Sequence, residues 1–153
     1  MDLIATVPEF SDIMGIPEAR GTVFRGTQDL EGRTVTCMKP FLTDVNVSQW
    51  IFDHQSRVLI TAEAFGHYHD PGQCDATSAD TALRYGNVER FYRDKLTFLD
   101  QLDLAKVRDA FAVLFDRLDP AYVAPIHGNP VAAADLDDYV DDVLTAMDVP
   151  SAR

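Results

Sequence analysis

Residues 57–66, RVLITAEAFG, combine an apolar run with a carboxylate at its end. The run VLI at 58–60 is continuously apolar, as expected for a strand that is buried on both faces. Glu63 follows this strand, where a carboxylate needs a partner or water. From residue 66 to residue 78 the chain is polar and contains a Pro-Gly pair, which predicts a loop.

The segments upstream of this stretch predict further strands. Trp50–Asp53 and Arg57–Thr61 have the pattern of a hairpin with HQS as its turn. The alternating RTVTCMK predicts a strand over Thr34–Lys39. Nearer the N-terminus we expect a short strand at Leu3–Thr6, one or two helical turns from Pro8 to near Gly15, and a short strand at Thr22–Arg25.

Helical periodicity dominates the second half of the chain, because apolar residues recur three and four positions apart. The first stripe, broken only by Lys95, is Val88, Phe91, Tyr92, Leu96 and Leu99. The second is Leu104, Val107, Phe111, Leu114 and Leu118, and Asp119-Pro120 is expected to end that helix. A final helix over Ala133–Met147 carries Leu136, Tyr139, Val140, Val143, Leu144 and Met147 on one face. Its aspartates are interpreted as a solvated acidic face.

Strands mixed with helices indicate an α/β layer fold. In such folds ligands bind at the loops beyond the strand ends. Two loops meet this condition, one after RVLITAEAFG and one after YVAPIHGNP at 122–130. Glu63 and His127 lie at these two strand ends. Trp50, Phe91, Phe111 and Phe115 are interpreted as core or interface aromatics.

Length and composition favour one globular domain over the 153 residues. No run approaches the ~20 apolar residues of a membrane span, and the N-terminus MDLIATVPEF lacks the features of a signal peptide. Two cysteines, Cys37 and Cys74, are too few for a disulfide scaffold. We therefore expect a cytoplasmic protein with reduced thiols.

The charge of the chain is strongly one-sided. The formal net charge is −12, with 20 Asp against 5 Glu and 10 Arg against 3 Lys. A negative field repels phosphate backbones, which argues against a nucleic-acid partner. The Asp-rich, Lys-poor surface suggests adaptation to a salty cytoplasm, where salt screens the self-repulsion, or else an acidic surface encoded by a GC-rich genome.

In order and spacing, the chain resembles the metallo-β-lactamase-fold domain of flavodiiron proteins. The motifs are RVLITAEAFG, then ERFYRDKL, then LDPAYVAPIHGNP, preceded by DLEGRTVTCMKPFLTDVNVSQWIFD. The resemblance extends from Leu3 to about Val131. It implies a two-metal oxidoreductase family that reduces dioxygen or nitric oxide. It also implies an αββα sandwich, here truncated to a mixed sheet flanked by helices.

The chain departs from the family's pattern of metal ligands. The first His-rich motif of the family has no counterpart here, and Thr43 or Asp44 stands where a further histidine is expected. Glu63 replaces the bridging aspartate, and His127 retains the last histidine ligand. A flavodoxin domain that would bind flavin is not expected in this chain.

The candidate metal site consists of Glu63, His127, His67 and His69, with iron or zinc as the metal. Asp70 and Cys74 could join it, although Asp70 and Asp75 also suit the turns around the Pro-Gly pair. The alternative for His127 is a structural histidine that caps a turn.

A half-sandwich would expose the inner face of its sheet, and an exposed apolar face usually marks an interaction surface. We therefore expect a homodimer, or a partner chain that supplies the missing half. Three hypotheses follow. The chain is a degenerate relative that acts by assembly with vestigial metal binding. Alternatively, it is an active metal-dependent hydrolase or oxidoreductase whose site is completed by a partner chain or by His67, His69 and Asp70. The third hypothesis is a non-catalytic small-ligand or redox-responsive binding module.

Overall fold

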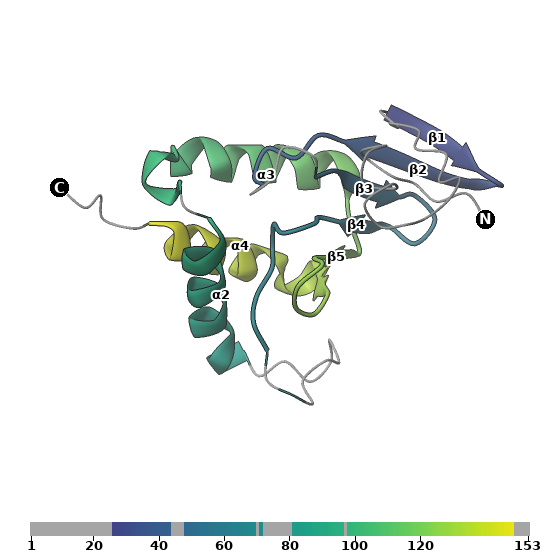
Figure 1. Ribbon diagram of the computed structural model, residues 1–153. Helices are drawn as coiled ribbons and strands as arrows, with labels where there is room; N and C mark the ends of the chain where they lie inside the picture. Colours follow the sequence, from purple (N-terminus) through teal and green to yellow (C-terminus); the bar gives the residue numbers. More distant parts are fainter. Residues whose placement is uncertain (1–25, 44–47, 70, 72–80, 97, 149–153) are drawn as a thin grey trace, which may run out of the picture.

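The structure, a computed structural model, describes residues 26–43, 48–69, 71, 81–96 and 98–148. These residues contain one six-stranded mixed sheet in the order β1-β2-β3-β4-β5-β6 (Figure 1). The strands are β1 (Gly26–Leu30), β2 (Arg33–Met38), β3 (Trp50–Asp53), β4 (Val58–Ile60), β5 (Tyr122–Ala124) and β6 (Val131–Ala132). The predicted strands at Leu3–Thr6 and Thr22–Arg25 and the turns from Pro8 lie outside the described residues.

Strands β1 to β4 form an antiparallel meander, in which β3 and β4 make the predicted hairpin. Strand β5 then pairs with β4 in parallel, and β6 returns antiparallel to β5. A parallel pair cannot be joined by a tight turn, so the chain between β4 and β5 crosses over through helices. The crossover brings the C-terminal ends of β4 and β5 side by side at the same end of the strands.

The helices are α2 (Thr81–Lys95), the 3-10 turn η2 (Leu99–Gln101), α3 (Leu104–Leu118), the 3-10 turn η3 (Ala133–Asp135) and α4 (Leu136–Met147). Helix α4 packs against both α2 and α3, and Figure 1 shows these helices together on the side of the molecule away from the β1–β2 hairpin. Asp119 ends α3 in the left-handed conformation, with φ of 47°, just before Pro120. None of the helices in the described ranges is both long and apolar enough to cross a membrane.

The core lies between the helices and one face of the sheet. Phe52, Leu59 and Val123 stand side by side across β3, β4 and β5, and all three are buried. The apolar stripes of α2 and α4 close over this face, with Val88, Phe91, Tyr92, Tyr139, Val143 and Met147 each at most 1% exposed. The three predicted stripes therefore face inward, although only Phe111 of α3 is fully buried.

The opposite face of the sheet is more exposed at β4 and β5 than predicted. The VLI run was predicted to be buried on both faces, but Ile60 is 40% exposed and Tyr122, on the adjacent strand, is 46% exposed. The physical reason is that successive side chains alternate between the faces, and the helices cover only the face that holds Leu59. Cys37, also on the opposite face, is a buried free thiol, and burial raises its pKa.

Candidate functional site

The segment that follows β4 makes two tight turns. Ala64 N–H donates to Thr61 O at 3.1 Å, and Gly66 N–H donates to Glu63 O at 3.0 Å. Ala62 and Phe65 have φ of 48° and 66°, a conformation that is costly for residues with a Cβ. The surrounding contacts must therefore hold these turns in place.

Two buried tyrosines supply those contacts. Tyr92 Oη, from α2, accepts a hydrogen bond from Phe65 N–H at 2.9 Å. Tyr139 Oη, from α4, donates to Phe65 O at 2.8 Å. The two hydroxyls thus hold both polar atoms of the Phe65 backbone. Burial also raises the pKa of the Tyr92 hydroxyl above its ordinary value.

The loop after β5 runs beside these turns. Ile126 N–H donates to Ala62 O at 2.9 Å, and His67 N–H donates to His127 O at 3.2 Å. Gly128 has φ of 99°, and a Cβ at this position would lie 2.6 Å from the ring of His67. Glycine is therefore required for both the backbone conformation and the close approach.

His67 is buried, and both of its ring nitrogens are used. Asn129 N–H donates to Nε2 at 3.1 Å, so Nε2 carries no proton. Nδ1 lies 2.8 Å from Tyr139 Oη, whose proton goes to Phe65 O. The arrangement is satisfied by the neutral tautomer with the proton on Nδ1. A metal at either nitrogen would have to break one of these bonds.

Glu63 and His127 lie side by side at the end of the β4–β5 pair. His127 Nε2 is 3.4 Å from Glu63 Oε2, and this oxygen is buried and has no hydrogen-bond partner. The side chain of His127 is 46% exposed, whereas that of Glu63 is 15% exposed. The ring of Phe91 packs against His127 with 5.8 Å between the centroids. The pair can thus present two metal-ligating atoms, and one of its members reaches solvent.

Among the described residues, no other candidate ligand completes this pair. His69 is exposed, and Asp44, Asp70, Cys74 and Asp75 lie outside the described residues. Within the described ranges, no group of three or more His, Cys, Asp or Glu side chains could hold a metal ion. A catalytic zinc takes about three protein ligands, and a two-iron centre takes more. Glu63 and His127 therefore fit part of a metal site and not a whole one.

Sequence reasoning did not assign Tyr92, Tyr139 or Asn129 to the site. Both tyrosines were assigned only to apolar helix stripes. The one available signal was chemical, since a tyrosine that is buried usually needs a partner for its hydroxyl. That signal could not identify the partners, which lie 27 and 74 residues away in the chain.

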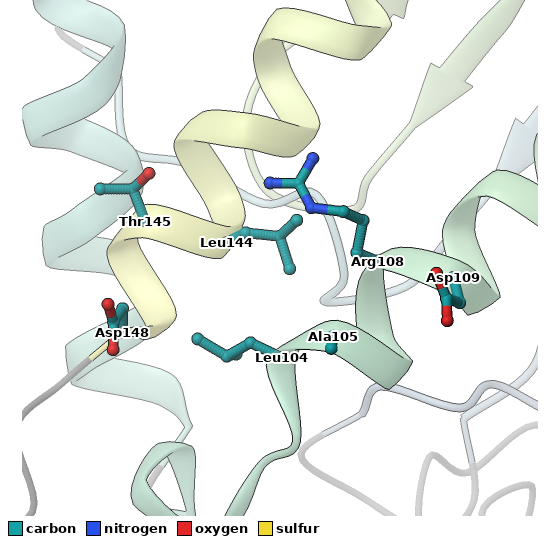
Figure 2. A pocket seen from close by; sticks show the side chains of 7 residues that line it. All are labelled: Leu104, Ala105, Arg108, Asp109, Leu144, Thr145 and Asp148. Carbon is teal, nitrogen blue, oxygen red and sulfur yellow. The ribbon is translucent and has the colours of Figure 1, made fainter.

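A separate pocket of about 350 Å³ lies between α3 and α4. Figure 2 shows Leu104 and Leu144 at its centre, with Asp109 and Asp148 on opposite sides. The guanidinium of Arg108, which also lines it, is already paired with Asp141 at 2.7 Å. None of the lining residues belongs to the Glu63–His127 pair.

The described fold is similar to that of solved flavodiiron proteins. Rubredoxin oxygen:oxidoreductase from Desulfovibrio gigas has a TM-score of 0.72 and 16% identity, and the match covers 93% of this chain and 36% of that protein. The flavodiiron protein from Giardia intestinalis has a TM-score of 0.69 and 16% identity, over 90% of this chain and 33% of that one. The Flv1 flavodiiron core from Synechocystis has a TM-score of 0.63 and 19% identity, over 93% and 34%.

No protein-family model and no curated protein matches the sequence. The chain spans about a third of the length of the solved structures that it matches. At these identities the similarity establishes the fold and leaves the chemistry open. The chain therefore has the mixed α/β, metallo-β-lactamase-like fold of one part of the flavodiiron proteins, as the motifs around RVLITAEAFG and YVAPIHGNP predicted.

Proposed function

We propose that this chain is a degenerate flavodiiron-type domain that acts by assembly, first as a homodimer, with weak or vestigial metal binding at Glu63 and His127. The observation that carries the proposal is an exposed apolar patch over β4 and β5, on the face of the sheet opposite the helices. Ile60 and Tyr122 lie on adjacent central strands, and Ile126 in the following loop is 59% exposed. Central strands rarely present large apolar side chains to water unless another surface covers them.

Charge shapes how such a dimer would form. Each chain carries a net charge of −12, so two copies repel each other. Salt screens this repulsion. Association through the face formed by Ile60 and Tyr122 should therefore strengthen as salt rises. Salt also strengthens apolar burial when the anion is excluded from the protein surface. A cytoplasmic, salt-adapted protein without a nucleic-acid partner is consistent with this behaviour and remains our expectation.

Light scattering coupled to size-exclusion chromatography tests the assembly. We expect a dimer at high salt, and we expect Ile60→Lys to convert it to a monomer by placing a charge in the apolar face. Val113→Lys is the matched control, because Val113 is 68% exposed on α3 and α3 covers the other face. A wild-type monomer at every salt and protein concentration would overturn the proposal.

The alternative is an active metal-dependent hydrolase or oxidoreductase whose site is completed by a partner chain or by His67, His69 and Asp70. One observation favours it. The buried Oε2 of Glu63 has no hydrogen-bond partner, as expected of a ligand atom, and it faces the partly exposed His127. A bound iron or zinc ion would supply Lewis-acid or redox chemistry, but two ligands alone leave it without a defined site.

Metal content separates the two functions. The chain is purified without chelators or an affinity tag, and its metals are measured by elemental mass spectrometry. A full equivalent of iron or zinc that is lost in both Glu63→Ala and His127→Ala would favour the enzyme. Sub-stoichiometric metal that either substitution lowers further would favour the degenerate, assembling domain with weak binding at this pair.

A further inference from the structure

We infer that His67 and Tyr139 are positioning residues that hold Glu63 and His127 against each other. This inference rests on the proposed role of that pair. Neither His67 nor Tyr139 makes a recorded side-chain contact with Glu63. They act on the two backbone segments from which Glu63 and His127 project.

His67 fixes the segment that carries His127 at three successive residues. Its backbone N–H donates to His127 O at 3.2 Å, and its ring lies where a Cβ on Gly128 would be. Its Nε2 accepts from Asn129 N–H at 3.1 Å. His67 thereby holds the backbone on the C-terminal side of His127. This sets the direction in which the imidazole of His127 leaves the chain.

Tyr139 joins this ring to the segment that carries Glu63. Its single hydroxyl accepts a hydrogen bond from His67 Nδ1–H and donates one to Phe65 O. Phe65 lies in the turn that Glu63 O closes by accepting from Gly66 N–H. One buried oxygen from α4 therefore links the turn after Glu63 to the His67 ring within the loop after β4, and the ring carries the connection on to Asn129 in the loop after β5.

The sheet alone does not provide this connection. The backbone bonds between the two segments are Thr61 N–H to Ala124 O and Ile126 N–H to Ala62 O before Glu63 and His127 are reached, and His67 N–H to His127 O beyond them. Beyond them, the register of the segments depends on His67. Removing the Tyr139 hydroxyl takes this acceptor away from Nδ1–H, which favours a change of tautomer that releases Asn129.

NMR of the full-length, metal-free chain tests the inference. The ¹⁵N shifts of the His67 ring should show a protonated Nδ1 and an unprotonated Nε2. Nuclear Overhauser cross-peaks should join the His127 ring to Glu63 and to Phe91. Because their intensity falls with the sixth power of distance, a loosening of about 0.5 Å in a separation near 3.4 Å weakens them about twofold.

We expect Tyr139→Phe to lose the His67 tautomer signature and to weaken these cross-peaks by about twofold or more. His67→Gln provides a second variant, because its side chain can accept from Asn129 but does not reproduce the imidazole. Tyr122→Phe is the control, since that tyrosine lies on the exposed face of the sheet, and its spectrum should be unchanged. Cross-peaks of unchanged intensity in both folded variants would overturn the inference.

Zinc titration of the same proteins distinguishes this inference from the proposed function. If wild-type protein binds no zinc while Tyr139→Phe weakens the cross-peaks, the positioning role is supported and metal binding by Glu63 and His127 is refuted. If zinc binding requires Glu63 but Tyr139→Phe changes neither the cross-peaks nor the zinc affinity, metal binding by the Glu63–His127 pair is supported. The positioning role of Tyr139 is then refuted.

Discussion

Replacing Tyr139 by phenylalanine should destabilise the fold through one oxygen atom. The ring is 1% exposed and packs near the rings of Phe65 and His67, so its apolar contacts survive the substitution. The lost hydroxyl takes a hydrogen-bond partner from two buried groups, the Nδ1–H of His67 and the carbonyl of Phe65. An unsatisfied buried group costs about 1–3 kcal/mol, which gives a loss of roughly 2–4 kcal/mol after some relaxation.

Tyr92→Phe is the matched comparison. It removes one buried acceptor and strands only the N–H of Phe65, so we expect about half the loss, roughly 1–2 kcal/mol. Because both tyrosines act on the same turn, the double variant should lose less than the sum of the two single losses. For a chain of this size, the larger loss corresponds to a fall in Tm of roughly 4–16 °C.

Urea unfolding followed by circular dichroism measures these free energies. Tyr122→Phe, on the exposed face, should stay within about 0.5 kcal/mol of wild type. If Tyr139→Phe also falls within that range, or costs no more than Tyr92→Phe, the hydroxyl does not hold both Phe65 O and His67 Nδ1, and the reasoning is refuted.

Two further predictions concern glycine and acid. Gly86→Ala should raise the unfolding free energy by up to about 1 kcal/mol, because Gly86 is exposed within α2 and a Cβ there meets nothing within 4 Å. Gly66→Ala should instead destabilise, since its Cβ would overlap the ring of Phe91; equal effects in urea unfolding would contradict this. Hydrogen bonds from Arg33 and Ser56 hold the pKa of Asp53 well below its usual range. Because the pKa of Asp53 is lower in the folded chain, its ionised carboxylate stabilises the fold above the unfolded pKa of about 4. This stabilisation is lost as the pH falls further. Asp53→Asn should thus be less stable than wild type at pH 7, with the gap closing below about pH 4; a gap independent of pH would be inconsistent with this linkage.

Much of the secondary structure could be predicted from local sequence. The alternation of RTVTCMK corresponds to β2 at Arg33–Met38, and the predicted hairpin corresponds to β3 and β4. The predicted helix over Ala133–Met147 begins as the short turn η3 and becomes α-helical at Leu136. The boundary shifted because helix ends depend on capping contacts, whereas the apolar period depends only on the residues within the helix.

The site was less predictable than the elements that carry it. Glu63 and His127 could be placed at two strand ends from sequence, and the parallel pairing of β4 with β5 is what brings those ends together. His67 was proposed as a ligand from its residue type and its place in HYH. The structure instead surrounds its two ring nitrogens with a backbone amide and a tyrosine from α4.

The sequence by itself determined most of the described strands and helices, although not β1 or β6, and also which helix faces are apolar and the strongly negative charge, because each depends on neighbouring residues or on composition alone. Only the tertiary structure decided that Ile60 faces outward, that Glu63 meets His127, and that His67 is engaged at both nitrogens. These outcomes depend on contacts between residues about 60 to 75 positions apart in the chain. No local period encodes such contacts, since they arise when the crossover through α2 and α3 returns the chain to the edge of β4.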